Sequence, residues 1–378
     1  MKKVLCFAAA AMTLFAACQK TTVVYDNSEP QEIAVFAVNK TATKAPVAGE
    51  TFPTDYSMQV AAYLAAGDGV TPGDYFDGTT FTNGTGQTNW AGGKYWPVSA
   101  ATLNFLAVAP QVGASATAAE DETAGATITT VFGTTPVDPA AEGGDETPEK
   151  TNYVSQSVTT VTHNDADQYD VMYAVASASK AAGSAPSAVG MTFNHAYAWL
   201  DFKFSKTNSE QGAPTIKINS VTVNGVATDG TLTVTVSNYD SVNNDLEVTN
   251  PSWSDYTPSN IVVPAVDNTD DILIKEETLD ATPTQYYNGL LLIPEHPMTS
   301  FVINYTTTVG GVDHTFDYTY TPPTSLSWDA GYKYTYNIKM SFSQIEVSPS
   351  VSTWEDYDAD PNENGDQPID VNTTTIEN

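Results

Sequence analysis

The sequence predicts an all-β fold made of two β-sandwich domains in tandem. Short apolar segments recur along the chain, and segments rich in glycine, asparagine, threonine and aspartate separate them. No apolar stripe at helical spacing continues for more than about two turns. Aromatic residues make up 11% of the chain, and 20 of them are tyrosines, as is typical of β structure. Because single cores stop growing at roughly 250 residues, a chain of 378 residues indicates two domains, with a boundary near residues 185–190.

Residues 1–17 are expected to be a signal peptide. Lys2 and Lys3 precede an apolar run that is too short to span a bilayer. The run ends in "LFAAC", which resembles the lipobox of bacterial lipoproteins and predicts lipidation of Cys18; an ordinary signal peptide cut nearby is the alternative. Two or more acyl chains would anchor the exported protein stably in the outer membrane.

Charge and cysteine content exclude several classes of function. The formal net charge is -31, and such a surface repels nucleic acid and anionic lipid headgroups. Cys6 leaves with the signal peptide, so Cys18 is the only thiol of the mature chain. An intramolecular disulfide, a thiolate zinc cluster and a cysteine nucleophile are therefore excluded.

The N-terminal half begins with a tether and a first strand in residues 18–44, in which "IAVFAV" (33–38) has strand character. Residues 45–188 are expected to form the N-terminal sandwich. Its predicted strands are "YSMQVAAYL" (56–64), "LNFLAVAP" (103–110) and "QYDVMYAVAS" (168–177). Residues 111–168 are rich in alanine, threonine, glycine and glutamate, so we expect a long surface insertion there.

Residues 189–354 are expected to form the C-terminal sandwich. In "WLDFKFS" polar and apolar residues alternate, and in "YKYTYNIKM" tyrosine, isoleucine and methionine share one face. "VNG" indicates a hairpin. After Trp354 the chain is acidic and rich in turn formers, so residues 355–378 are expected to be an acidic C-terminal tail.

No catalytic, metal or cofactor site is predicted. The four histidines occupy separate segments without metal-ligand spacing, and His195 is expected to make a structural hydrogen bond; they are His163, His195, His296 and His314. "DADPNENGD" begins like a calcium loop but has Val371 at position 12, so an EF-hand fails and another calcium site stays open. Nucleophile-elbow, Walker and dinucleotide-binding glycine patterns are missing. The chain is therefore not expected to be an enzyme.

Five phrases, in their order along the chain, resemble the fimbrillin family, the FimA/Mfa-type pilins and fimbrillin-like lipoproteins of Bacteroidetes. They are "KYWPVSAATLNFLAVAP", "FNHAYAWLDFKF", "LLLIPEH", "WDAGYKYTYNIKM" and "IEVSPSVSTW". The resemblance implies transthyretin-like, Greek-key sandwich domains. It also implies a structural subunit of a cell-surface pilus, with other pilus subunits as partners and adhesion as a further role.

The family implies assembly by strand exchange. A trypsin-like surface protease cuts behind the first strand, which leaves, and a C-terminal segment of a neighbouring subunit fills the groove. Lys44, before Ala45, is the preferred cleavage position, and Lys40 is the alternative. "IAVFAV" is apolar on both faces, so we expect a fully buried strand. Loss of its four large apolar side chains would cost roughly 6–12 kcal/mol; they are Ile33, Val35, Phe36 and Val38.

Two C-terminal segments could be the donor strand. In "QIEVSPSV" Ile345, Val347 and Val351 alternate with polar residues, and this segment is slightly favoured. In "IDVNTTTIEN" Ile369 and Val371 lie on one face of a more polar strand.

A surface-exposed glycan-binding lipoprotein is the alternative function. Sugar rings stack on exposed aromatic side chains, and four tryptophans are candidates for such platforms: Trp90, Trp96, Trp253 and Trp328. If these tryptophans are core residues instead, the pilus subunit is favoured.

Overall fold

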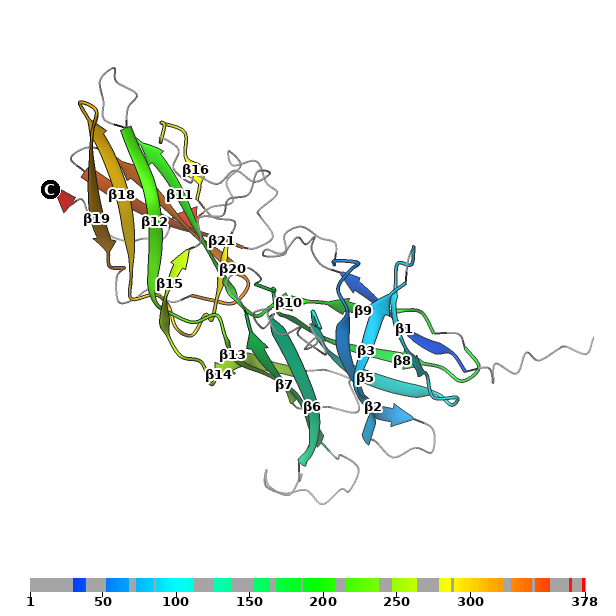
Figure 1. The fold of residues 1–378 in the computed structure, drawn as a ribbon. Coiled ribbons are helices and arrows are strands. Elements are labelled where there is room, and N and C mark those ends of the chain that lie inside the picture. Colours follow the sequence, from blue (N-terminus) through cyan, green and yellow to red (C-terminus); the bar gives the residue numbers. More distant parts are fainter. Residues whose placement is uncertain are drawn as a thin grey trace, which may run out of the picture.

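The computed structural model describes sixteen segments of the chain. They are residues 30–38, 52–67, 73–84, 86–111, 126–137, 152–163, 168–184, 186–207, 215–237, 247–263, 279–286, 289–322, 328–341, 344–353, 367–368 and 376–377. The described residues form strands and connections and contain no helix, so the all-β prediction is confirmed (Figure 1). Accordingly, these segments include no helix that could cross a membrane.

The N-terminal sandwich is an eight-stranded sheet in the order β10-β8-β5-β2-β3-β4-β1-β9. The sheet folds back on itself, because one core cluster joins Ile33 and Met191 of one half to Met58 and Leu103 of the other. The strands are β1 (Glu32–Val38), β2 (Met58–Gly67), β3 (Gly73–Asn83), β4 (Trp90–Tyr95), β5 (Ala101–Ala109), β8 (Met172–Lys180), β9 (Val189–Thr192) and β10 (Asn194–His195).

The C-terminal sandwich packs two sheets around a second core cluster that is rich in tyrosine and phenylalanine. One sheet follows the order β16-β11-β20-β21-β22, with β17 beside β11 and β23 beside β21, and the other follows β15-β12-β18-β19. The strands are β11 (Ala198–Lys206), β12 (Thr215–Val226), β15 (Ser259–Val263), β16 (Thr284–Gln285), β17 (Leu290–Leu292), β18 (Ser300–Val309), β19 (Val312–Tyr320), β20 (Tyr332–Met340), β21 (Gln344–Thr353), β22 (Gln367–Pro368) and β23 (Ile376–Glu377).

A third layer joins the two halves of the chain. β6 (Thr127–Val137) and β7 (Asn152–Thr162) form a hairpin inside the segment where a surface insertion is expected. β7 then pairs with β13 (Gly230–Ser237), which pairs with β14 (Glu247–Ser254). Composition did not predict this hairpin, because its strands are rich in threonine and serine and poor in large apolar residues. β-Branched threonine nevertheless suits strands well.

The third core cluster lies where this layer meets both sandwiches. It includes Leu106 and Val108 of β5, Leu232 of β13, and Trp199 and Leu291 of the C-terminal sheet. Figure 1 shows the β6–β7 and β13–β14 strands below and between the two sandwiches. The two sandwiches are therefore connected through a shared apolar core rather than by a bare linker.

A buried histidine marks the edge of this third cluster. The His163 side chain is 2% exposed, and its ring lies 5.7 Å from that of Tyr197. The backbone N–H of Tyr169 donates a 3.2 Å hydrogen bond to Nε2. Burial lowers the pKa of His163, and nearby Asp229 opposes that shift. The fold therefore favours the neutral imidazole.

We expect His163 to weaken the fold at acidic pH. An unfolded histidine has a pKa of about 6.5, so below that pH the unfolded chain binds a proton that the folded chain resists. The free energy of unfolding then falls until pH reaches the lower folded pKa. Urea unfolding of the wild type and of His163→Gln between about pH 7.5 and about pH 5 should show a smaller pH effect in the variant.

His314→Gln is the matched control, because His314 is exposed on β19. An equal pH dependence in His163→Gln and in the wild type would contradict the assignment of His163.

Candidate functional site

β1 is an internal strand of the N-terminal sheet. It pairs antiparallel with β4, with Val35 opposite Trp90, and parallel with β9, where Phe36 lies opposite Gly190. Removing β1 would thus expose the backbone hydrogen-bonding groups of β4, which is antiparallel to β1, and of β9, which is parallel to it. The backbone N–H of Trp96 also donates a 2.8 Å hydrogen bond to the carbonyl of Gln31, just before the strand.

One face of β1 is buried and the other is not. Ile33 and Val35 are fully buried and Ala37 is 7% exposed, which agrees with a period of two. Phe36 is 47% exposed, so the expectation of a strand buried on both faces is wrong. The Phe36 side chain lies on the outer face of the sheet, and none of the layers that the structure describes covers it there. The stabilisation from burying Ile33 and Val35 is therefore about 3–6 kcal/mol, half of the figure expected for four buried side chains.

Aromatic side chains form the wall of the groove in which β1 lies. The Phe52 ring is 5.2 Å from Trp90 and 4.6 Å from Phe193, and all three belong to the same core cluster as Val35. The Trp90 indole N–H donates a 2.8 Å hydrogen bond to the Tyr56 carbonyl, which fixes the ring independently of β1. A groove without its strand would present this aromatic surface to water.

The described segment that contains β1 ends at Val38, and the next described segment begins at Phe52. Cys18, the cleavage positions Lys40, Lys44 and Ala45, and the signal peptide 1–17 lie outside the described residues.

The two candidate donor segments lie side by side. β21 contains Ile345 and Val347, which are buried in the C-terminal core, and Val351, which packs against it. β21 pairs with β20 along its length on one side and with the short β22 and β23 on the other. The segment between β22 and β23 holds Ile369 and Val371, which lie outside the described residues. β21 is thus an integral core strand, and β22 and β23 are the outermost described strands on one edge of this sheet.

Comparison with known proteins decides the family. The sequence model of the fimbrillin-like family matches residues 26–354, from before β1 to the end of β21. The chain belongs to the fimbrillin-like family. No protein with a curated description is detectably similar to it in sequence.

Several solved structures resemble this fimbrillin-like chain. A candidate cell adhesion protein from Bacteroides uniformis is 17% identical, with a TM-score of 0.42, and the match covers 85% of this chain and 99% of that one. A fimbrial assembly protein from Parabacteroides distasonis is 10% identical, with a TM-score of 0.34 and coverage of 86% and 96%. The fimbrial anchor protein Mfa2 from Porphyromonas gingivalis is 10% identical, with a TM-score of 0.29 and coverage of 86% and 98%.

The four candidate tryptophans of the fimbrillin-like chain do not form an exposed surface for sugars. The four candidate platforms are between 3% and 7% exposed: Trp90, Trp96, Trp253 and Trp328. The Trp253 indole N–H donates a 3.0 Å hydrogen bond to the Ala196 carbonyl, as a core residue does. The glycan-stacking interpretation is wrong for these four residues.

His195 makes a buried structural hydrogen bond, as expected. Its Nδ1 lies 2.7 Å from Asp170 Oδ2, and the two side chains are 6% and 0% exposed. The pair connects β10 to the residues that precede β8. Within the described segments, acidic, histidine and cysteine side chains do not gather in groups of three that could hold a metal ion.

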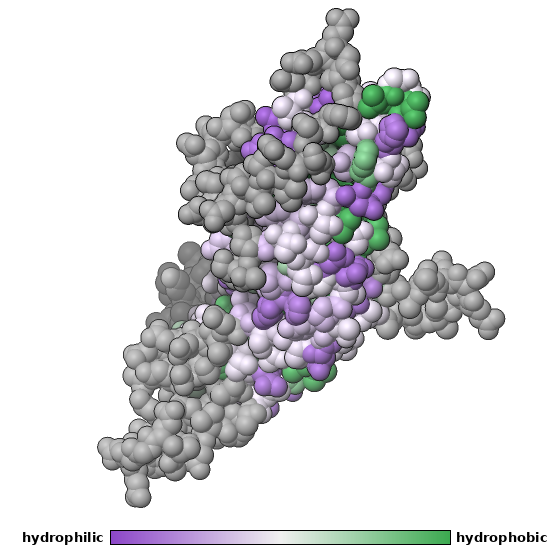
Figure 2. Space-filling model, turned by 90° about the vertical axis from the view of Figure 1, so that its left-hand side faces the viewer, coloured by the Kyte–Doolittle hydropathy of each residue, from purple (hydrophilic) through white to green (hydrophobic). Residues whose placement is uncertain are grey.

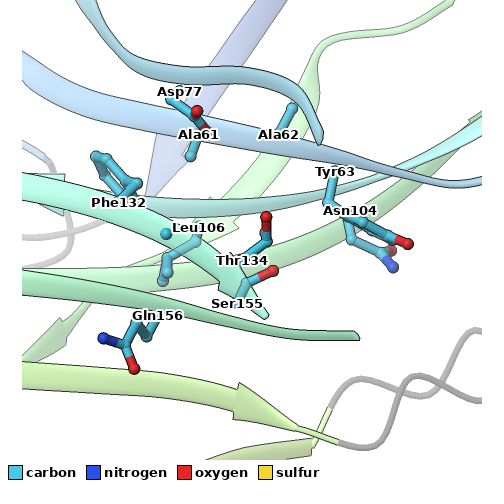
Figure 3. A pocket seen from close by; sticks show the side chains of 11 residues that line it. Ala61, Ala62, Tyr63, Asp77, Asn104, Leu106, Phe132, Thr134, Ser155 and Gln156 are labelled. Atoms are coloured by element: carbon cyan, nitrogen blue, oxygen red, sulfur yellow. The ribbon is translucent and has the colours of Figure 1, made fainter. Parts of the chain in front are cut away.

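A crevice separates the N-terminal sheet from the β6–β7 hairpin (Figure 3). Asn104 of β5 and Ser155 of β7 are 2% and 7% exposed, and their side-chain polar atoms have no hydrogen-bond partner among the described residues. Asp77, Phe132 and Thr134 also line it. A narrow space lined by buried polar atoms is suited to hold water molecules.

A buried ion pair that the sequence pattern did not predict joins β11 and β20. Lys333 Nζ of β20 lies 3.2 Å from Asp201 Oδ2 of the parallel strand β11, and the two side chains are 5% and 0% exposed. The same Nζ lies 4.2 Å from the centre of a Trp199 ring. Burial raises the pKa of Asp201, and the charge of Lys333 opposes that shift. The sequence offers only a weak signal for this pair, because β11 carries Lys203 as well as Asp201 and β20 carries Lys339 as well as Lys333.

Proposed function

We propose that this chain is a structural subunit of a cell-surface pilus, exported as a lipoprotein and assembled by protease-triggered strand exchange. The observation that carries the proposal is β1 itself. It is an internal strand with a buried apolar face, and the sequence places Lys40 and Lys44 within six residues of its end. Family membership supports the pilus, and the lipobox at Cys18 supports the anchor.

The energetics of β1 support exchange rather than simple loss. Removing Ile33 and Val35 would forfeit about 3–6 kcal/mol, against a net domain stability of about 5–15 kcal/mol. The freed edges of β4 and β9 would also have unpaired backbone groups. A strand from a neighbouring subunit would restore both the burial and the hydrogen bonds.

We propose residues 355–378 as the donor, in place of the slightly favoured β21 segment. Ile345 and Val347 are core residues of their own domain, so their departure would unfold it. β22 and β23 pair with β21 at only two residues each, so that edge can release them at small cost.

The first test is the N-terminal residue and intact mass of the protein taken from the cell surface. A lipid-free chain that begins at Ala45 would support strand removal. A mature chain that still begins at acylated Cys18 in the assembled pilus would contradict it.

Deleting residues 355–378 is expected to abolish multimers without unfolding the subunit. Wild-type protein should give a ladder of multimers on a gel run without heating, because the contacts are non-covalent. The deletion variant should give only monomer and should keep its thermal unfolding transition within a few degrees, since a loss of less than about 1 kcal/mol moves a large domain little. A persistent ladder would contradict the donor assignment.

A further inference from the structure

β19 is an edge strand whose free side is open to solvent. It ends the sheet β15-β12-β18-β19, and its first six residues are exposed. We propose that β19 of one copy of this chain pairs antiparallel with β19 of a second copy, with Phe316 at the centre, so that two sheets become one. The pairing rests on β19 itself, and its role as a contact between cells rests on the proposed surface location of the chain.

β19 lacks the features that usually protect a sheet edge. Proteins cover the free N–H and C=O groups of an edge with proline, lysine, a bulge or a short strand. β19 has nine residues, contains neither proline nor lysine, and pairs with β18 without a shift in register.

The other strands at the edges of the described sheets each have such a feature. β9, β10, β16, β17, β22 and β23 are two to four residues long. β6 contains Pro136, β14 contains Pro251, and β15 pairs with β12 across a shift in register. β19 is therefore the described edge that is best prepared to accept a further strand.

The β18–β19 hairpin decides which backbone groups of β19 are available. Gly310 and Gly311 have positive φ and form a two-residue turn, so that Val309 lies opposite Val312. Residues that flank such a turn exchange hydrogen bonds, and the direction of the backbone groups then alternates along the strand. Four residues of β19 therefore turn their N–H and C=O groups to the free edge: Asp313, Thr315, Asp317 and Thr319.

One antiparallel register pairs two copies of β19 along their whole length. It sets Phe316 opposite Phe316 of the other copy, Thr315 opposite Asp317, and Asp313 opposite Thr319. A centre at Thr315 would instead set Asp313 against Asp317, and a centre at Asp317 would set that acid against itself. Like charges directly opposite one another destabilise a sheet, so the full-length register is also the one that charge favours.

The apolar side chains of β19 suit this pairing. Val312 and Phe316 are 57% and 47% exposed. The Phe316 ring packs 5.7 Å from that of Tyr305, which is buried in the C-terminal core. A second β19 would bring the two Phe316 rings together at the edge of both cores. Exposed apolar surface on a highly charged protein marks a contact site.

The polar side chains of β19 are already ordered by β18. Thr308 donates a 2.6 Å hydrogen bond to Asp313, and Asn304 donates one of the same length to Asp317. The Thr306 and Thr315 hydroxyls lie 3.2 Å apart. The bond between Thr308 and Asp313 is a cross-strand threonine–aspartate pair, which is the kind of pair that the proposed register would add on the other side of β19.

The position of β19 leaves room for a partner. Figure 1 shows it at the outer edge of the C-terminal sandwich, with β18 as its one neighbour among the described strands. Figure 2 views the molecule from this side, and in its upper part green, apolar atoms lie beside purple, polar ones. The edge is therefore an accessible surface of mixed character.

The occupant is a second copy because the edge is complementary to itself. Such a contact has a two-fold axis. β18 and β19 run roughly along the long direction of the molecule (Figure 1), so the two copies would point in opposite directions. Chains on the surfaces of two facing cells are oriented in this way. The net charge of -31 opposes association, so many weak contacts acting together would be needed to hold two cells.

A single cysteine tests the pairing. In the proposed register the two copies of position 316 face each other as a pair without mutual backbone hydrogen bonds. Their Cα atoms are then about 4.5 Å apart, which a disulfide can bridge. Full-length Phe316→Cys on the cell surface should, on mild oxidation, give a dimer that survives heating and disappears with reductant. The wild type, which has Cys18, should give none.

Val312→Cys is the matched control. Val312 lies on the same strand and is more exposed than Phe316, but the register sets it opposite Tyr320 and far from its own copy. It should give no disulfide dimer. Adding Thr315→Pro to Phe316→Cys should abolish the dimer and keep the thermal unfolding transition, because this proline removes an N–H of the free edge and none that faces β18.

The contact between cells is tested by mixing two strains that carry Phe316→Cys with different epitope tags. Dimers that contain both tags would support it, and dimers that contain only one kind of tag would overturn it. Absence of dimers from Phe316→Cys, or equal dimers from Val312→Cys, would overturn the β19 pairing itself.

These outcomes are separate from those of strand exchange. A wild-type ladder of multimers without a Phe316→Cys dimer would leave strand exchange standing and overturn the β19 pairing. A Phe316→Cys dimer in a protein that forms no ladder would support the β19 pairing and contradict strand exchange.

Discussion

Val35→Asp is expected to unfold the N-terminal sandwich, whereas Phe36→Asp, one residue further along β1, is expected to leave it folded. Val35 is fully buried in the core cluster that contains Met58 and Phe105, while Phe36 is 47% exposed. An uncompensated carboxylate at a buried position costs on the order of 3–5 kcal/mol or neutralises at a similar cost. On the surface the same change typically costs within about 0.5 kcal/mol.

The measurement is urea unfolding monitored by tryptophan fluorescence. Trp90 and Trp96 lie in the same core cluster as Val35, so their fluorescence reports on this sandwich. The two variants introduce the same charge at neighbouring positions of the same strand. Any difference between their stabilities therefore reflects the two faces of β1. Equal destabilisation of both would mean that the outer face of β1 is buried in solution.

Breaking the Asp201–Lys333 pair on one side is expected to have the second large effect. Lys333→Met leaves the fully buried Asp201 carboxylate without its 3.2 Å partner, which should cost about 3–5 kcal/mol. The double variant Asp201→Leu with Lys333→Met removes both charges and keeps side chains of similar length. We expect it to be more stable than Lys333→Met by about 3 kcal/mol.

A double-mutant cycle in urea measures this coupling, with Asp201→Leu as the fourth corner. Lys339→Met is the matched control, because Lys339 lies on the same strand and is exposed. It should change the free energy of unfolding by no more than about 0.5 kcal/mol. Additive effects of the two single substitutions would show that the ion pair contributes no coupling.

The alternation of polar and apolar residues predicted those strands in which the local sequence alone decides which side chains face the core. In β20 the alternation places Tyr334, Tyr336 and Ile338 in the core. The same reasoning found β1 but misplaced Phe36, because alternation says which residues share a face and not how many faces another layer covers.

Features that depend on distant strands could not be found in this way. The β6–β7 hairpin joins the larger sheet because β7 pairs with β13, which is about seventy residues further along the chain. Asp201 and Lys333 lie in strands more than a hundred residues apart, and only the parallel register of β11 and β20 brings their side chains together. Pairing at such separation is a property of the whole topology and not of a local segment.

The mixed pairing of β1 gives its groove a direction. A strand that replaces β1 and repeats its hydrogen bonds must run antiparallel to β4 and parallel to β9, as β1 does. An insert running the other way would exchange the two kinds of ladder and meet donors and acceptors at the wrong spacing. Copies linked through this groove would therefore all face the same way, and the resulting fibre would have two chemically distinct ends.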